Sequence, residues 1–445
     1  MRFSHPHDAR LRLSGRFYYR AHVKAPLLLA ATLLFGCGYS GAIRGQTAQP
    51  VSGPVIGHVD TTSARIWARP PSTTFTFSVT KSNGEACTVT RSEADGSYIF
   101  HAVGLTPNST YRYRLDCGEA GTTERAFQTA PSGLKHRVRL AFGSCANHKR
   151  FKDQPIWKTI DSHSPDTMVI LGDTPYIDTT DLAVQRTRYR EFFSVPDTRS
   201  VFSDTPTWAT WDDHDFGKND TDGRVPGKER SRQAFVEHHA HASFGDGESG
   251  IYTSFRWGPA EVWVLDTRWW ANTEPSPADP SKKSLLGAAQ WRWVTEGLKR
   301  SDATFKVLAS GMIWNGSVRP LKRDHWANWK SERDALWRFI GDNHIPGVVL
   351  VGGDIHRSRA LRHPPISPKG YPLTELISSP LANTIIVTAK VPHPGLLHDA
   401  AEQHTFLLVT IDGTRDDPTL LAEVRNHEDK VLFAVPLKAS ELRTR

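Results

Sequence analysis

Short runs of alternating apolar and polar residues fill the chain between residues 51 and 131. The clearest runs are ARIWAR, TFTFSVT, YIFHAVGL and STYRYRL, and turn-forming stretches such as SNGE and TPNS separate them. A period of two residues indicates strands with one buried face, and no helical period is present in this region. We therefore expect residues 51–131 to form an all-β domain, a small sandwich of two sheets.

The pattern changes after the stretch APSGLKH, where apolar runs alternate with amphipathic ones. Two amphipathic runs predict helices, GAAQWRWVTEGLKRS and SERDALWRFIGDN, and the first places Trp291, Val294 and Leu298 on one face. The apolar runs predict strands, namely RVRLAFGSC, TMVILGD, TWATWDD, EVWVLD, FKVLASG, GVVLVGGD and TFLLVTI. Strands that alternate with helices indicate an α/β domain, which we place at residues 136–440.

Polar groups directly follow four of these predicted strands. The strand ends carry Gly143-Ser144-Cys145, Gly172-Asp173 with Tyr176 three residues later, Asp212-Asp213-His214, and Asp354-Ile355-His356. Sites in open α/β sheets form at the carboxyl ends of strands, so these groups are expected to converge. Each feature alone is weak, because Gly-Asp pairs are usually turns and buried cysteines usually pack in the core. The four together predict the site of a metal-dependent hydrolase.

The stretch WDDHDFGKND, residues 211–220, places four aspartates around one histidine. Carboxylates this close in sequence repel one another unless a cation neutralises them. A bound metal ion is the functional interpretation, and a solvated acidic loop that closes a strand is the alternative.

These stretches carry a family resemblance. In the order GSC, LGDTPY, WDDHDFGKND, LDTRWW and GGDIH, they resemble the PhoD-like alkaline phosphatase (phosphodiesterase) family of the metallophosphoesterase superfamily, from residue 51 to about residue 430. The resemblance implies an α/β four-layer αββα metallophosphoesterase sandwich, preceded by an all-β immunoglobulin/fibronectin-like domain. It also implies iron and calcium as cofactors, export from the cytoplasm, and phosphate esters as substrates.

The resemblance also suggests a soft and a hard metal position. In the wider superfamily an Asp-x-His pair follows the first strand, and Cys145 occupies that place here. Together with Asp173, Tyr176 and His356 it forms a thiolate, phenolate and imidazole set, which suits Fe³⁺.

The hard position combines Asp173 as a bridge with Asp213 and Asp354, and oxygen ligands suit Ca²⁺ or another divalent metal such as Mg²⁺. Asp212 and Asn219 either complete this set or hold a second Ca²⁺. For Asn219, capping of the loop is an equal alternative.

His214 resembles the superfamily histidine beside the metals, which protonates the leaving alkoxide or stabilises charge on the phosphoryl oxygens. Asp215 is expected to fix the His214 ring through a hydrogen bond. Lys218 and Arg357 are candidates to contact substrate phosphate, with a solvated or structural role equally open. Arg268 in LDTRWW is interpreted as supporting structure. The expected mechanism is in-line attack by a metal-activated hydroxide, which needs no Ser or Cys nucleophile.

The charge of the 445-residue chain is concentrated at its N-terminus. The formal charge is +8, but the first 36 residues alone hold six Lys/Arg against one acid, Asp8, so no nucleic-acid-binding surface is expected. A basic stretch followed by APLLLAATLLFG predicts a signal peptide at residues 1–36. LLFGC resembles a bacterial lipobox that would lipidate Cys37, with cleavage near GAIRGQTAQ as the alternative. Residues 37–50 are then a linker, and the protein is exported to the periplasm or cell surface.

An exported chain usually pairs its cysteines. Cys87 and Cys117 lie in the same β-rich region and are predicted to form a disulfide. Cys145 is then unpaired, and it requires burial or a metal ion.

Two further questions stay open from the sequence. A rival interpretation is a non-catalytic cell-surface adhesion or carbohydrate-binding protein, favoured by the aromatic stretches RWWANTEP and HWANWK. Against this interpretation, suitable residues are present at every metal-ligand position of the motifs, whereas a site without catalysis would be free to lose several. The sequence therefore favours an enzyme. The choice between phosphate mono- and diester depends on loops over the site, which we place at 218–250, 270–285 and 314–330. A monomer is expected, with a lipid at Cys37 as its membrane contact.

Overall fold

The structure is a computed structural model that describes residues 52–319 and 321–444, which belong to one compact unit. The predicted signal peptide, the lipobox at Cys37 and the linker lie outside the described residues. Among the described helices, none combines the length and apolar character needed to cross a bilayer.

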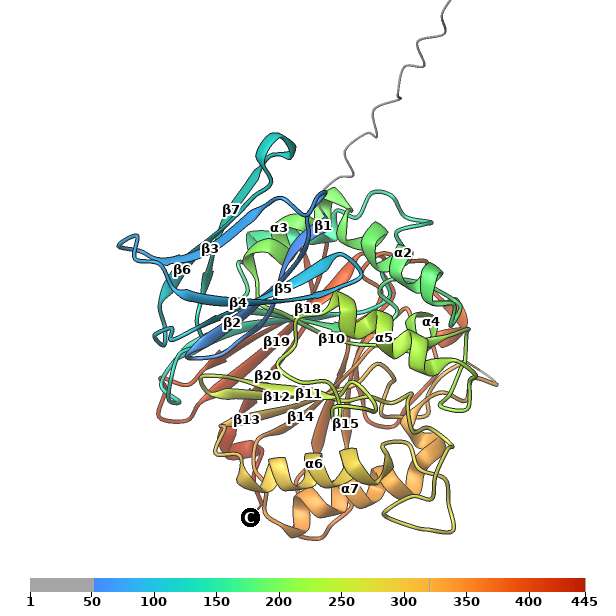
Figure 1. Cartoon of the computed structure of the whole chain (residues 1–445). Coiled ribbons are helices and arrows are strands. Elements are labelled where there is room, and N and C mark those ends of the chain that lie inside the picture. The colour runs from blue at the N-terminus through green and yellow to red at the C-terminus, as the bar shows by residue number, and fades with distance from the viewer. Residues whose placement is uncertain (1–51, 320, 445) are drawn as a thin grey trace, which may run out of the picture. The chain divides into compact units, whose positions relative to one another are not determined.

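Two antiparallel sheets form the N-terminal region (Figure 1). One has the order β1-β2-β5-β4 and the other β3-β6-β7. Their bounds are β1 Ser52–Val59, β2 Ser63–Arg69, β3 Thr76–Lys81, β4 Thr88–Ala94, β5 Ser97–Val103, β6 Thr110–Asp116 and β7 Thr122–Gln128. The sheets pack face to face, with the ring of Phe77 in β3 stacked 3.8 Å from that of Phe100 in β5. On β6 alternate side chains are buried, so the two-residue period predicted the strand correctly.

A six-stranded sheet continues the chain, in the order β10-β9-β8-β18-β19-β20. Its strands are β8 Arg137–Gly143, β9 Thr167–Leu171, β10 Thr207–Thr210, β18 Thr405–Asp412, β19 Thr419–Asn426 and β20 Val431–Lys438. Strands β8, β9 and β10 are parallel, and the other three are antiparallel to their neighbours.

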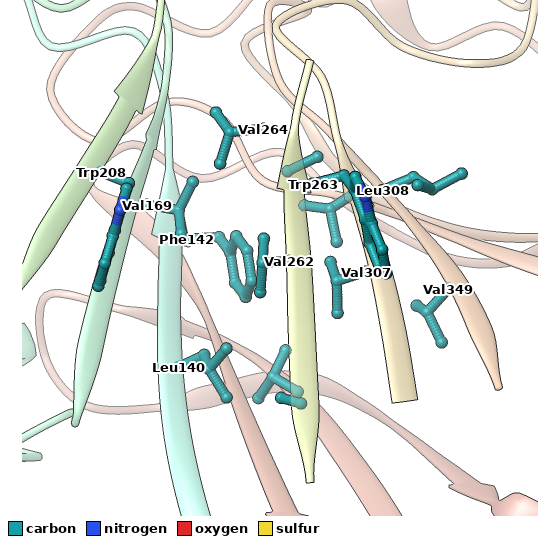
Figure 2. Packing of buried hydrophobic residues seen from close by; sticks show 14 of the residues in the cluster. Leu140, Phe142, Val169, Trp208, Val262, Trp263, Val264, Val307, Leu308 and Val349 are labelled. Carbon is teal, nitrogen blue, oxygen red and sulfur yellow. The ribbon is translucent and has the colours of Figure 1, made fainter. Parts of the chain in front are cut away.

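A seven-stranded sheet has the order β11-β12-β13-β14-β16-β15-β17. Its strands are β11 Thr253–Trp257, β12 Ala260–Val264, β13 Phe305–Ala309, β14 Val348–Gly352, β15 Ser358–His363, β16 Leu373–Ile377 and β17 Leu396–Ala400. Strands β12, β13, β14 and β16 are parallel. Figure 2 shows the two mixed sheets facing each other across a shared core, with Phe142 and Val169 from one sheet and Val262 and Val307 from the other.

Helices cover the outer faces of both mixed sheets. They are α1 Ile156–Ser162, α2 Leu182–Phe193, α3 Pro196–Asp204, α4 Asp213–Phe216, α5 Lys228–His238, α6 Gly287–Arg300 and α7 Lys330–Asp342, with 3₁₀ turns at η1 Gly118–Ala120, η2 Trp326–Trp329, η3 Val387–Ala389 and η4 Ala439–Glu441. On β8, Leu140 and Phe142 face the shared core, whereas Ala141 faces a second core that includes α1, α2, α3 and α5. Helices α6 and α7, both predicted, lie along the seven-stranded sheet (Figure 1).

Cys87 and Cys117 are free thiols, so the predicted disulfide is wrong. The backbone N–H of Cys87 donates to Val79 of β3, whereas Cys117 follows Asp116, which pairs with Thr76. The two cysteines are therefore displaced by about four residues along the strand, or roughly 13 Å. A disulfide needs Cα atoms within roughly 7 Å.

Candidate metal centre

The polar groups at the four strand ends converge as predicted, since residues that follow β8, β9, β10 and β14 lie together at one site. One group that could hold a cation is formed by Cys145, Asp173 and His356. A second contains Asp173, Asp212, Asp213 and Asp354. Ligand atoms within each group lie within 4.8 Å of one another, and Asp173 belongs to both. The bridging position expected for Asp173 is consistent with this geometry.

The backbone is strained at four of these positions. Cys145, Asp173, Asp354 and His356 have φ of 63°, 52°, 72° and 51°, in the left-handed region that non-glycine residues rarely adopt. Such strain costs on the order of 1–3 kcal/mol per residue and gathers at functional sites. Gly172 lets the end of β9 pack closely against the end of β10, because a Cβ atom at this position would lie 2.4 Å from the backbone nitrogen of Asp212.

The first group, which corresponds to the soft position predicted from the sequence, has the protonation state and hydrogen bonds that a metal ligand set needs. Cys145 Sγ and the Tyr176 hydroxyl lie 3.5 Å and 3.3 Å from Asp173 Oδ2, and the hydroxyl lies 2.9 Å from His356 Nε2. His356 Nδ1–H donates to the carbonyl oxygen of Thr384 at 2.7 Å, which leaves Nε2 as the lone-pair nitrogen. Burial lowers the pKa of His356 to about 4, so the ring is neutral, as a metal ligand must be.

The hard group holds more negative charge than the protein neutralises. Burial raises the pKa of Asp173 and Asp212 well above their usual ranges, and neighbouring carboxylates reinforce the effect. Asp212 Oδ2 and Asp354 Oδ2 are buried and have no hydrogen-bond partner. Buried carboxylate oxygens without partners are costly unless a cation binds them. This donor set therefore fits a metal centre.

Arg268 supports the site structurally, as predicted. Its side chain is fully buried; Nε donates to Asp212 Oδ1 at 2.7 Å, and Nη2 contacts Asp212 and, at 3.1 Å, Asp324. Burial raises the pKa of Asp213, but Arg268 and Lys322 outweigh it and hold that pKa below its usual range.

Lys322 and Asp324 belong to the site, although the sequence did not reveal them. Lys322 Nζ lies 2.9 Å from both Asp354 Oδ1 and Asp324 Oδ1. Asp324 also forms a group of three carboxylates with Asp213 and Asp220. Both new residues lie in the long loop between β13 and α7, and they are too far from the end of β13 at Ala309 for that strand to mark them.

His214 is oriented by Asp178, so the predicted hydrogen bond from Asp215 is wrong. His214 Nδ1–H donates to Asp178 Oδ1 at 2.5 Å. Asp215 instead accepts backbone N–H groups, from Asp212 at 2.5 Å and Thr174 at 3.4 Å, so it ties the strand ends together. Burial lowers the pKa of His214, but Asp173 and Asp178 outweigh it and raise the pKa to about 10.

Arg357 and Lys218 do not face the pocket above the metal centre. Arg357 is buried and holds Asp399 through two hydrogen bonds of 2.5 and 2.7 Å, which gives it a structural role. Lys218 is exposed, outside the pocket lining. Asn219 does line the pocket, and its role as a ligand stays a prediction.

The comparisons with known proteins agree with this geometry. A family model for PhoD-like phosphatase matches residues 140–407, more than half of the chain. The chain belongs to the PhoD-like phosphatase family. It is 27% identical over 309 residues to alkaline phosphatase D of Bacillus subtilis (strain 168), and the match covers 58% of this chain and 53% of that protein. The chain thus matches about half the length of this curated relative.

Two solved structures show the same fold as this PhoD-like chain. The structure of PhoD superposes with a TM-score of 0.70 at 20% identity and covers 87% of this chain and 88% of that one. Purple acid phosphatase PPD1 from yellow lupin (Lupinus luteus) seeds superposes with a TM-score of 0.67 at 13% identity and covers 87% and 74%. At these identities the likeness concerns the fold, a metallophosphoesterase-like arrangement of mixed sheets.

The pocket of this family member has a volume of about 380 Å³ above the metal centre. Of the loops expected over the site, 314–330 contributes Val318, Arg319 and Lys322, whereas 218–250 contributes Asn219 and contains helix α5. The segment 270–285 contributes nothing to the lining. The segments 147–150 and 383–389, not predicted, supply much of it.

The aromatic stretches that favoured an adhesion protein are not exposed. Trp269, Trp270, Trp326 and Trp329 are all buried, at 8% exposure or less. These side chains belong to the core, so they offer no surface for binding a carbohydrate.

Proposed function

We propose that this protein is a metal-dependent phosphoric ester hydrolase, an alkaline phosphatase or phosphodiesterase. The observation that carries the proposal is the convergence of Cys145, Tyr176, His356 and the aspartates around Asp173 beneath a single pocket. Membership in the PhoD-like family supports the same reaction class, as does the name of the Bacillus relative. We infer an αββα sandwich preceded by an immunoglobulin/fibronectin-like domain, and export with a lipid at Cys37.

Two kinds of cation suit the two ligand groups. Cys145, Tyr176, His356 and Asp173 would hold Fe³⁺, and the carboxylates of Asp212, Asp213 and Asp354 would hold one or two Ca²⁺, with other divalent metals as alternatives. Bound metals supply Lewis-acid polarisation of the phosphoryl oxygens and lower the pKa of a bound water.

The protein side chains orient and protonate the substrate. His214 lines the pocket, and its hydrogen bond to Asp178 holds the ring so that Nε2 can donate a proton to the leaving alkoxide. Lys322, Arg150 and Arg319 also line the pocket and offer positive charge to the phosphate. Their charge assists binding without a covalent intermediate on the protein.

Turnover of chromogenic esters tests the proposal. The purified protein should hydrolyse p-nitrophenyl phosphate, its bis-ester analogue, or both, and the ratio of the two rates decides between monoester and diester. Asp173→Asn should abolish turnover because this carboxylate serves both ligand groups, whereas the exposed Asp246→Asn should not change it. Hydrolysis of neither ester in any metal tested would contradict the proposal.

Metal content provides an independent measurement. The protein should contain iron and show a visible charge-transfer band, which Cys145→Ala should remove. A calcium chelator should stop turnover but leave the band, since oxygen-bound ions exchange more readily than a thiolate-bound one. Zinc as the sole metal, with full activity that is indifferent to Cys145→Ala, would contradict the iron and calcium assignment.

A further inference from the structure

The pocket above the metal centre has an apolar wall. Val318, Ile355, Ile386 and Ala389 line it together, and all four belong to one hydrophobic cluster or pack against it. The lining of the same pocket also contains the polar residues Asn147, Arg150 and Asn383. A phosphate group alone would make no use of the apolar wall.

Two unusually exposed side chains lie in the loops that supply this wall. Leu321 is 91% exposed and Val387 is 78% exposed, whereas the other exposed large hydrophobic residues of the described chain reach 38–45%. Leu321 directly precedes Lys322, and Val387 directly follows Ile386. Lys322 and Ile386 both line the pocket. Single exposed apolar residues are common, but apolar residues grouped at a pocket indicate a binding surface.

The pocket is also larger than a phosphate requires. At roughly 30 Å³ per heavy atom, the share of a water molecule in the liquid, the five atoms of phosphate need about 150 Å³. The pocket has about 380 Å³, so there is room for ester groups of several carbon atoms.

We propose that the substrate is a phosphodiester with one apolar alkyl or aryl ester group, which packs against Val318, Ile355, Ile386 and Ala389, with Leu321 and Val387 at the rim. The inference rests on the proposed hydrolase function and names its substrate class. A diester fits because its second ester group can be polar and can contact Asn147, Arg150 or Asn383, which also line the pocket. In the reaction, water forms a new P–O bond, one ester P–O bond breaks with its electron pair, and the departing oxygen takes a proton.

Two diesters with the same leaving group isolate this contact. We would compare kcat/KM for p-nitrophenyl hexyl phosphate and p-nitrophenyl methyl phosphate, both used as dissolved monomers. Each buried methylene group is worth about fourfold, so two buried methylenes predict a preference of about 15-fold for the hexyl ester. The triple variant Leu321→Ser, Ile386→Ser, Val387→Ser should reduce this ratio to threefold or less.

Controls separate specificity from folding and from general loss of function. Leu421→Ser combined with Val431→Ser removes two exposed apolar side chains on β19 and β20, outside the pocket lining, and should keep the wild-type ratio. Residual turnover of the methyl ester and an unchanged melting temperature show that the triple variant is folded.

Three results would overturn the inference while leaving the hydrolase function intact: equal rates for both diesters, turnover of monoesters alone, or a hexyl preference that the triple variant retains. A preference that requires added phosphatidylcholine vesicles would also overturn it, because the apolar residues would then contact a lipid surface rather than the substrate. Absence of all ester hydrolysis would instead refute the proposed function itself.

Discussion

At the scale of single residues, the contact between His214 and Asp178 is expected to determine the rate. His214 Nδ1 lies 2.5 Å from Asp178 Oδ1, and the ring lies 4.4 Å from that of Tyr176. His214→Ala should lower kcat by roughly 10²–10⁴-fold, the scale of a general acid, with metal content unchanged. Asp178→Asn should cost roughly 10–100-fold, because the ring loses its orientation.

Steady-state kinetics and elemental analysis on the same samples test this assignment. Asp302→Asn, at an exposed carboxylate that pairs with Arg256, serves as the control and should behave as wild type. Loss of metal in His214→Ala would show that this histidine is a ligand rather than an acid.

Arg268 is expected to contribute to stability through its buried ion pairs. Arg268 is fully buried between Asp212 and Asp324, so its removal leaves the buried Asp212 carboxylate without its cationic partner, whereas Asp324 keeps Lys322. Arg268→Met should lower the free energy of unfolding by about 3–5 kcal/mol. The pair of the exposed Arg224 with the half-buried Asp222 gives the control, since Arg224→Met should cost less than about 1 kcal/mol.

Urea unfolding in one buffer measures both Arg variants. If Arg268→Met and Arg224→Met lower the free energy of unfolding equally, the buried ion pairs of Arg268 stabilise the protein no more than a surface ion pair does.

Most of the candidate ligand residues were predictable because they follow an apolar strand within a few residues, which fixes their place at the sheet edge. Lys322 and Asp178 lie in irregular loops and reach the site through long-range folding, so no local pattern marks them. Asp215 shows an error of another kind, in which nearness in sequence suggested a contact that the structure does not contain. Its neighbour in sequence is His214, but the turn at the start of α4 directs its carboxylate to the backbone N–H of Asp212.

At the scale of elements, the C-terminal end of α5 carries a buried histidine cluster beside the N-terminal sheets. The ring of His239 stacks 4.0 Å from that of Phe235, and the backbone N–H of His58 in β1 donates to Ala240 O at 2.8 Å. Burial lowers the pKa of His238 to about 3 and that of His239 to about 4, from an ordinary value of 6.5.

Acid should therefore destabilise this junction. Between pH 6.5 and about 4 the unfolded chain binds protons on these histidines while the folded chain does not, so stability is fully present above pH 6.5 and is lost as the pH falls. One such histidine accounts for up to about 3 kcal/mol. His239→Phe should reduce the fall in melting temperature between pH 7 and pH 5.

The measurement is the change in melting temperature between pH 7 and pH 5, and not the absolute stability of each variant. Val201→Ala destabilises α3 without removing a titratable group, and it should keep the full slope. An unchanged slope in His239→Phe would assign the acid sensitivity to other groups.

Helix α5 also illustrates why several elements escaped prediction. Its buried face includes Ser231, Glu237 and His238, and that of α2 includes Gln185, so polar residues interrupt the apolar period. Helices α6 and α7 were found from the sequence by the helical spacing of their apolar residues, although they also bury polar residues such as Gln290 in α6 and Glu332 in α7.

At the scale of the whole molecule, the N-terminal sheets and the mixed sheets share one core. Every residue of β1 is buried, Trp67 Nε1–H donates to Glu237 O at 2.8 Å, and Tyr113 OH donates to Ser203 O at 2.8 Å. One hydrophobic cluster includes residues of β1 and β2 as well as β8 and β12. Independent domains would instead meet through a small and mainly polar interface.

We therefore expect one cooperative unfolding transition for residues 52–444, and no stable fold for a chain that begins at residue 136. Gly57 in β1 gives a precise probe, because a Cβ atom there would lie 2.4 Å from Ala240 O. Gly57→Val should lower the melting temperature seen by far-UV circular dichroism and the temperature at which turnover is lost by the same amount, since both report one unit. Gly84→Ala, in an exposed turn of the same region, adds a Cβ atom that meets no other atom but sits on a left-handed backbone with φ of 85°, so it measures backbone strain without a clash and should lower the melting temperature less than Gly57→Val. Two separate transitions, with turnover unaffected by Gly57→Val, would show that the N-terminal sheets are an independent domain.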